Sequence, residues 1–217
     1  MGEAERLRAE EILERLKERY PKISTALTYR DPWELLVVAV LSAQTTDENV
    51  NAVSPKLFAR WPRAQDLAGA DAEEVEDVIY STGFYRQKTR SIIALSQDLV
   101  ERYQGEVPAD LEELTTLRGV GRKTASVVLA EAFAMPAVAV DTHVRRVSAR
   151  LGLTRHREPV KIERDLKAIF PETEWAKLSV RLIQFGREVC IARRPRCWKC
   201  ELAELCPYPD KTPPPHE

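Results

Sequence analysis

Residues 117–124 bring together the residue types best able to do chemistry in this chain. They read Leu-Arg-Gly-Val-Gly-Arg-Lys-Thr, so a glycine turn, a helix start and Lys123 fall within one short segment. Bare backbone N–H groups at Gly119 and Gly121 can point at an anion, and the positive end of the following helix adds to the attraction. A lysine in a first helical turn opposes that dipole, which indicates a nearby phosphate or a nucleophilic amine. The plainer interpretation is a solvated lysine after an ordinary turn.

The same segment is not a Walker A loop, because that loop needs glycine directly before the lysine and Arg122 stands there. It matches instead the hairpin of a helix-hairpin-helix element. The first helix of that element is expected to follow Asp110, which can cap it, and to place Leu111, Leu114 and Leu117 on one face. Such an element grips a DNA backbone without reading bases, because its donors are main-chain amides aimed at a phosphate.

Asp141 follows the apolar extended stretch 135–140 and opens the next predicted helix. An aspartate before a helix is an ordinary N-cap, and that role alone explains its presence. Capping and catalysis are compatible, since N–H donors that hold a carboxylate also fix its direction. We therefore expect the carboxylate of Asp141 to accept a proton from Lys123 or to stabilise positive charge on a substrate.

The four cysteines of the chain all lie near its C-terminus, in the spacing C-x6-C-x2-C-x5-C. Cys190, Cys197, Cys200 and Cys206 can reach one centre, and four thiolates suit either tetrahedral zinc or an iron–sulfur cluster. The spacing alone leaves a structural zinc loop and a cluster equally open.

Charge is unevenly distributed along the 217 residues, although the formal net charge is only -1. Residues 64–77 carry carboxylates and no lysine or arginine, whereas residues 143–157 carry arginines and no carboxylate, and residues 181–200 are also strongly basic. This polarity favours one face that meets a polyanion, although charge runs are often only solvated surface.

No apolar run approaches the roughly 18 residues that a membrane helix needs. Residues 1–20 have the pattern of a charged amphipathic helix rather than that of a signal peptide. We therefore expect no membrane partner and a cytoplasmic location.

Turn signals at short intervals and the lack of alternating stretches predict an all-α chain. Asp31, Pro32 and Glu34 mark a helix start, and the apolar run that follows predicts a buried central helix continuing to Ala43. Further helices are expected near 47–60, 72–81, 86–103, 158–169 and 173–189. The tail 209–217, with three consecutive prolines, is expected to be disordered.

Four motifs together resemble the endonuclease III family of DNA repair glycosylases, within the helix-hairpin-helix superfamily. They are Leu41-Ser42-Ala43-Gln44-Thr45-Thr46-Asp47, residues 119–125, Val140-Asp141-Thr142-His143, and the cysteine tail that opens with Cys190-Ile191-Ala192-Arg193. The match covers nearly the whole chain, and the motifs keep the order and separations of the family.

The resemblance implies catalytic roles for Lys123 and Asp141 and a [4Fe-4S] cluster on the four cysteines. It also implies that the hairpin amides of Gly119, Val120 and Gly121 grip a DNA phosphate, often through a monovalent cation. The further residues expected at the DNA are Gln44, Phe84, Arg122, His143, Arg146 and Arg193. For Arg122, a solvated arginine is the equal alternative. The expected partner is duplex DNA containing damaged pyrimidines or abasic sites, bound by a monomer.

By the same resemblance, residues 25–135 form a six-helix barrel-like domain that contains the helix-hairpin-helix. Residues 1–24 and 136–217 form a helical iron–sulfur cluster domain. Lys123 and Asp141 then reach the active cleft from opposite sides of the domain boundary.

The implied activity is that of a bifunctional DNA N-glycosylase and abasic-site lyase in base excision repair, acting on oxidised pyrimidines. The damaged nucleotide is flipped into a pocket, the amine of Lys123 attacks C1′ to form a Schiff base, and β-elimination cleaves the strand on the 3′ side. Gln44 and Phe84 fill the gap left in the duplex. Phe84 stands where the family usually has leucine, and the larger ring would change the range of lesions or the preference for the opposite base. The alternative interpretation is that Phe84 is an aromatic residue of the core. Arg118 replaces a frequent proline and leaves the amide donors in place.

Two other functions stay open at this point. A monofunctional adenine-type mismatch glycosylase shares the hairpin and the cluster, but it usually lacks this lysine and carries a catalytic glutamate in the helix matching residues 35–44, where this chain has no carboxylate. A non-catalytic DNA-binding module with a structural metal loop explains the hairpin and the basic face, but it leaves Lys123 and Asp141 without a role.

Overall fold

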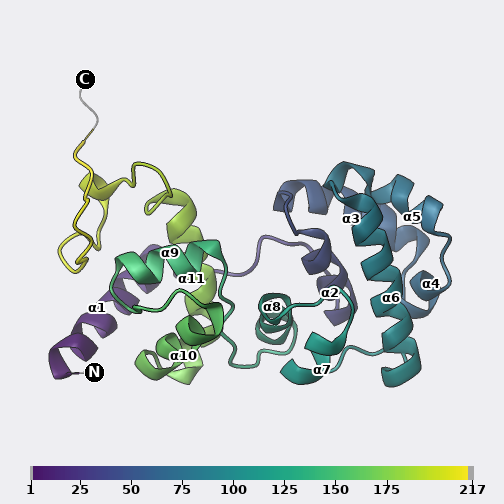
Figure 1. Ribbon diagram of the computed structural model, residues 1–217, viewed down its shortest axis with the longest axis horizontal. Helices are drawn as coiled ribbons and strands as arrows, with labels where there is room; N and C mark the ends of the chain where they lie inside the picture. Colours follow the sequence, from purple (N-terminus) through teal and green to yellow (C-terminus); the bar gives the residue numbers. More distant parts are fainter. Residues whose placement is uncertain (1, 215–217) are drawn as a thin grey trace. The chain divides into compact units, whose positions relative to one another are not determined.

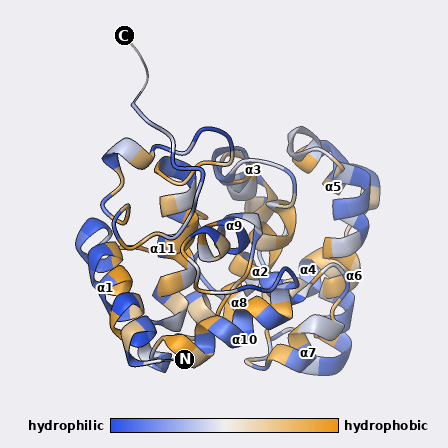
Figure 2. Ribbon diagram, turned by 60° about the vertical axis from the view of Figure 1, so that its left-hand side comes forward, coloured by the Kyte–Doolittle hydropathy of each residue, from blue (hydrophilic) through white to orange (hydrophobic). Residues whose placement is uncertain are grey.

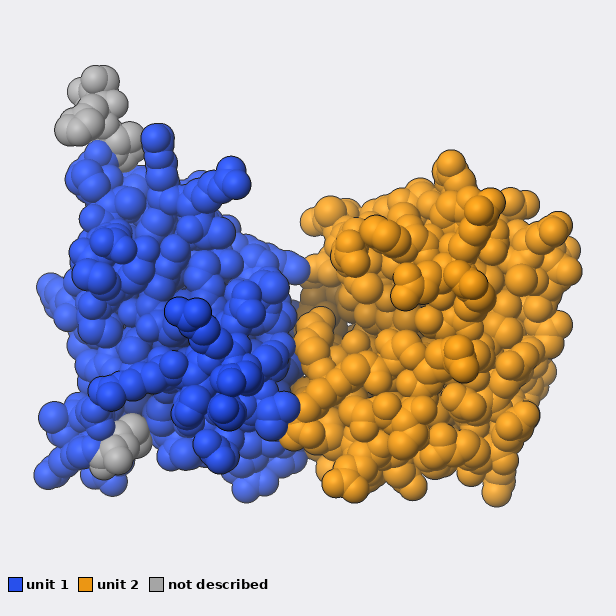
Figure 3. Space-filling view, in the orientation of Figure 1, with its two compact units in different colours: residues 1–24, 136–217 blue, residues 25–135 orange. Residues whose placement is uncertain are grey.

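The computed structural model of the protein describes residues 2–214, and their regular elements are all helices (Figure 1). This confirms the all-α class. The chain forms two compact units, coloured separately in Figure 3. Unit 2 is the continuous segment 25–135, and unit 1 combines residues 1–24 with residues 136–217. In the described part of the chain, no helix is both long enough and apolar enough to cross a membrane.

In unit 2 the other helices surround one central helix, α2 (Pro32–Leu41), which is buried along nearly its whole length. Its elements are α2 (Pro32–Leu41), α3 (Asp47–Arg60), α4 (Ala64–Ala68), α5 (Ala72–Ile79), η1 (Tyr80–Thr82), α6 (Tyr85–Tyr103), α7 (Leu111–Thr116) and α8 (Arg122–Ala132). Every residue of α2 from Trp33 to Leu41 is buried, and α2 packs against α3, α6 and α8. An apolar run with helix caps thus forms the centre of this unit, as predicted from its sequence.

Polar side chains begin several of these helices where the sequence places a cap. Asp31 accepts a hydrogen bond from the amide of Glu34 at 2.8 Å, and Asp110 accepts from the amides of Glu112 and Glu113. Two details differ from expectation. Helix α2 ends at Leu41 rather than Ala43, because the carbonyl of Ala39 accepts from the hydroxyl of Ser42 and the amide of Ala43 donates instead to Val40. The short helix α4 was not expected, although Asp66 caps it by accepting from the amide of Arg63 at 3.1 Å.

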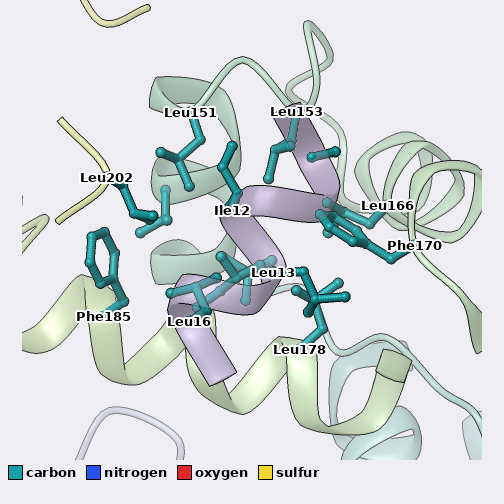
Figure 4. Packing of buried hydrophobic residues seen from close by; sticks show 14 of the residues in the cluster. Ile12, Leu13, Leu16, Leu151, Leu153, Leu166, Phe170, Leu178, Phe185 and Leu202 are labelled. Carbon is teal, nitrogen blue, oxygen red and sulfur yellow. The ribbon is translucent and has the colours of Figure 1, made fainter. Parts of the chain in front are cut away.

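Unit 1 joins the two ends of the chain around a shared core. Its elements are α1 (Glu3–Arg19), α9 (Thr142–Arg150), α10 (Pro159–Ile169), η2 (Glu172–Glu174), α11 (Trp175–Glu188) and η3 (Cys197–Lys199). Ile12, Leu13 and Leu16 of α1 pack with Leu178 and Phe185 of α11 (Figure 4). Helix α1 carries hydrophilic and hydrophobic residues along its length (Figure 2), as its amphipathic pattern predicted.

The C-terminal tail is partly held in place, which corrects the expectation of disorder for residues 209–214. The Nζ of Lys211 donates to the carbonyl of Ala203 at 2.7 Å, and the hydroxyl of Thr212 donates to the carbonyl of Pro195. Residue 1 and residues 215–217, included in the predicted N-terminal helix and tail, lie outside the described residues.

Candidate active site and metal centre

The hairpin between α7 and α8 needs glycine at position 119. Gly119 has a φ of +81°, and a Cβ there would lie 2.8 Å from the Cβ of Ser91 in α6. Val120 closes the turn, because its amide donates to the carbonyl of Leu117 at 3.1 Å. The sequence led us to expect three hairpin amides available to a phosphate. Within the described residues, the amides of Gly119 and Gly121 have no protein acceptor, whereas the amide of Val120 is already bonded.

Gly121 is the N-cap of α8 and places Lys123 in its first turn. Its φ is −88°, and nothing lies within 4 Å of an added Cβ, so the fold itself does not require glycine there. Lys123 is exposed, which leaves its amine accessible to an incoming molecule. Arg122 is also exposed and interacts with another group of the chain. The segment therefore presents an amine beside two bare amides at the positive end of a helix.

Asp141 caps α9 in unit 1. Its Oδ1 accepts a hydrogen bond from the amide of Val144 at 2.7 Å, and the side chain is half-buried. No hydrogen bond to its Oδ2 is made by the described residues. One oxygen thus orients the carboxylate while the other can accept a proton or face positive charge.

His143 and Arg146 of α9 lie against α11 at a glycine that sequence reasoning missed. A Cβ at Gly186 would lie 3.1 Å from the Cβ of His143 and 3.1 Å from a guanidinium nitrogen of Arg146. Burial lowers the pKa of the His143 imidazole, the charges of Arg146 and Arg187 lower it further, and Asp141 opposes them. His143 is therefore mainly neutral at neutral pH. A glycine inside an amphipathic helix was the available signal for this close approach.

Gln44 and Phe84 occupy two loops of unit 2 and both adopt left-handed backbone conformations. Their φ angles are 56° and 48°. Phe84 is 61% exposed, so the alternative that it is a core aromatic is wrong. Gln44 is exposed as well. Both side chains are accessible from solvent, as residues that enter a duplex would have to be.

The four cysteines line one cavity in unit 1. Cys190, Cys197, Cys200 and Cys206 are all half-buried free thiols, and apolar side chains such as Phe185 line the same cavity. Burial raises the pKa of the Cys200 thiol to about 11 and raises the pKa of Cys206 as well, with neighbouring cysteine charges adding to both shifts. Thiols in such a place lose their protons when a metal centre supplies positive charge. The donor set therefore fits an iron–sulfur cluster.

Arginines hold the segment that carries the first cysteine. Arg150 donates to the carbonyls of Ile191 and Ala192 at 2.8 and 3.0 Å and approaches the Sγ of Cys190 at 3.5 Å. Arg146 donates to the carbonyls of Gly186 and Cys190 at 2.8 and 3.0 Å. In the part of the chain that the structure describes, no three ligand side chains meet at a point suited to a single metal ion.

These contacts change the interpretation of the basic stretches. Arg181 is buried and paired with Glu174 at 2.7 Å, and Arg146 and Arg150 are occupied by backbone carbonyls. Part of the positive charge in residues 143–157 and 181–200 therefore stabilises the fold. This corrects the expectation that these stretches as a whole form a face that meets a polyanion. Arg193 is exposed and stays available to a polyanion.

Known proteins resemble this chain over most of its length. Residues 37–172 match the family described as HhH-GPD superfamily base excision DNA repair protein. The chain is 52% identical to Endonuclease III of Synechocystis sp. over 201 residues, which are 92% of each protein. Among solved structures it is similar to a non-covalent Endonuclease III–DNA complex, with a TM-score of 0.89 and 43% identity over 94% of this chain and 95% of that one. It is also similar to a trapped Endonuclease III–DNA covalent intermediate with an estranged adenine, with a TM-score of 0.90 and 43% identity over 94% of this chain and 96% of that one.

Proposed function

The chain belongs to the endonuclease III family of the HhH-GPD superfamily, and from this membership we propose how its own residues act on damaged DNA. It is a DNA-binding enzyme of base excision repair, a DNA glycosylase and abasic-site lyase. The family relationship overturns the alternative of a non-catalytic module. We propose that oxidised pyrimidines are its substrates, that Lys123 is the nucleophile and that Asp141 is its acid–base partner.

In the proposed reaction the unprotonated amine of Lys123 attacks C1′ of the flipped nucleotide while the bond from C1′ to the base breaks. The nitrogen gives up one proton, which neutralises the departing base, and the bond from C1′ to the ring oxygen O4′ then breaks as O4′ takes up a second proton, which leaves a Schiff base at C1′. Removal of a proton from C2′ expels the 3′ phosphate by β-elimination. The observation that carries this proposal is the exposed Lys123, two residues after a hairpin whose Gly119 and Gly121 amides can hold the neighbouring phosphate.

The role proposed for Asp141 follows from its two differently bonded oxygens. The bond from the Val144 amide to Oδ1 fixes the carboxylate, and Oδ2 can take the proton that the lysine must lose. A negative oxygen also stabilises the positive charge that develops on the sugar as the base departs.

The proposed DNA contacts divide into phosphate contacts and residues that enter the duplex. The amides of Gly119 and Gly121, with a monovalent cation at the hairpin, would hold a phosphate. We propose further contacts to the DNA backbone by Arg122, His143 and Arg193, whereas the Val120 amide and the Arg146 guanidinium already donate to carbonyls of the chain. Gln44 and Phe84 would fill the space of the flipped nucleotide. The enzyme would work as a monomer on duplex DNA in the cytoplasm, with the nucleoid.

We propose that Cys190, Cys197, Cys200 and Cys206 hold a [4Fe-4S] cluster. The cluster would cross-link the four thiolates and so order the loop between the first and last cysteine, which also carries the exposed Arg193. A visible absorption spectrum of the purified protein tests this assignment. A brown protein with a broad band agrees with it, and a colourless protein that contains zinc contradicts it.

Borohydride trapping tests the nucleophile. Wild-type protein incubated with abasic-site DNA and borohydride should form a covalent complex that survives denaturing electrophoresis, and Lys123→Gln should form none. Lys56→Gln is the matched control, since Lys56 is an exposed lysine of the same unit in α3. If wild-type protein does not trap abasic-site DNA but does release the base from a duplex that contains an oxidised pyrimidine, the enzyme is monofunctional and Lys123 is not the nucleophile.

A further inference from the structure

One side chain takes part in three hydrogen bonds that connect the two loops carrying Gln44 and Phe84. Asn49, half-buried in the first turn of α3, donates through Nδ2 to the hydroxyl of Thr45 at 3.0 Å and to the carbonyl of Ser81 at 2.8 Å. Its Oδ1 accepts from the hydroxyl of Ser81 at 3.0 Å. Thr45 directly follows Gln44, and Ser81 lies three residues before Phe84. The carboxamide therefore bridges both loops within unit 2.

Both loops contain backbone conformations that need such support. Gln44 and Phe84 are non-glycine residues in the left-handed region, a conformation that persists only where surrounding contacts enforce it. Gly83, directly before Phe84, also has a positive φ of 68°. Without a fixed partner, each loop can relax to conformations in which its tip no longer projects in the same direction.

A buried lysine supports the Phe84 loop from its other side. Lys88 of α6 is 5% exposed, and its Nζ donates to the carbonyl of Thr82 at 2.7 Å. The carbonyls of Ser81 and Thr82 are thus both held by side chains, one from α3 and one from α6. Asn49 differs from Lys88 in that it also reaches the Gln44 loop, through Thr45.

We propose that Asn49 is a positioning residue that fixes the Gln44 and Phe84 loops relative to each other, so that both tips enter the DNA already in place. The inference rests on the proposed function, because it assumes that these tips fill the space of the flipped nucleotide. Asn49 itself need not touch DNA. Its effect is to remove, before binding, the conformational freedom that the loops would otherwise lose on the duplex.

The test measures binding to a duplex with a non-reactive abasic-site analogue, with 2-aminopurine opposite the analogue to report unstacking. Asn49→Ala should weaken binding about tenfold, since it removes the bonds that order two loops, and should reduce the fluorescence rise on binding. Asn49→Asp keeps the size of the side chain but cannot donate to the carbonyl of Ser81, so it should behave like Asn49→Ala. Asn51→Ala is the matched control, because Asn51 in α3 makes similar bonds to Thr28 and Ala26, away from both loops.

The decisive comparison repeats Asn49→Ala in a Gln44→Ala/Phe84→Ala background. If Asn49 acts through the tips, its substitution should change binding less than about twofold once the tips are gone. An equal loss in both backgrounds would show a general structural role and overturn the inference, as would wild-type binding by Asn49→Ala or Asn49→Asp. Failure of the wild-type protein to trap abasic DNA would instead refute the proposed function.

Discussion

Replacement of the two hairpin glycines by alanine should separate the needs of the fold from those of DNA binding. At position 119 the φ of +81° costs an alanine about 1–2 kcal/mol. The 2.8 Å approach of its Cβ to the Cβ of Ser91 adds overpacking of about 1–3 kcal/mol. Gly119→Ala should therefore lose about 2–5 kcal/mol of stability, which lowers the unfolding midpoint of a protein of this size by about 4–20 °C.

Gly121→Ala should leave stability within about 1 kcal/mol of wild type, because its φ of −88° suits alanine and the space around its Cβ is open. Its DNA affinity should nevertheless fall, since the added methyl group would lie beside the amide that we propose to hold a phosphate. Thermal unfolding followed by circular dichroism and anisotropy binding to an abasic-analogue duplex measure the two effects.

Ser91→Gly provides a check on the steric part of the Gly119→Ala cost. It removes the atom that the new Cβ meets, so the double variant should recover part of the stability that Gly119→Ala loses, after allowance for about 0.5–1 kcal/mol for glycine in a helix. The reasoning is refuted if Gly119→Ala melts like the wild type, or if Gly121→Ala is as unstable as Gly119→Ala.

Three further predictions concern single side chains. Phe84→Leu should leave the unfolding midpoint unchanged, because the ring is 61% exposed, and should alter the relative affinity for abasic analogues opposite different bases, measured by anisotropy. Glu34→Ala should lose about 1–3 kcal/mol in thermal unfolding, because buried Glu34 accepts from the amide of Arg30 at 2.7 Å and from its guanidinium. The lowered pKa of His143 means that the unfolded chain binds its proton more readily. The stability from neutral His143 is therefore complete above about pH 6.5 and is lost as the pH falls below it. The free energy of unfolding, measured by denaturation, should fall less between pH 7 and pH 5 in His143→Gln than in the wild type. An equal fall in both proteins would contradict this.

Local signals in the sequence predicted most of the helical structure. Asp31 and Asp110 cap helices where their positions indicated, because a cap acts within its own helical turn. The all-apolar run after Asp31 predicted the buried helix α2, since only a central position hides every face. Helix α4 was missed because five residues are too few to show a periodic pattern.

Features that depend on distant contacts could not be predicted in this way. The left-handed conformations of Gln44 and Phe84 are unusual for residues with a side chain, and the hydrogen bonds of Asn49 reach across 32 residues to Ser81. Likewise, the count of arginines could not reveal that Arg146 binds backbone carbonyls of the segment around Gly186. The sequence identified the candidate nucleophile, carboxylate and thiols by type and spacing, and their hydrogen-bond partners became visible only in three dimensions.

The construction of unit 1 from both ends of the chain determines the order in which the protein can be completed during synthesis. Leu16 leaves the ribosome roughly 160 residues before its core partner Leu178, a delay of about 8–30 s at typical rates of translation. Residues 25–135, which include Lys123, are synthesised within that interval. During this time the apolar face of helix α1 is not yet covered by α11. The cysteines are made last of all. A chain whose synthesis ends early thus carries Lys123 but lacks the complete core and the thiols of unit 1. Both the core and the thiols of unit 1 therefore depend on synthesis of the full-length chain.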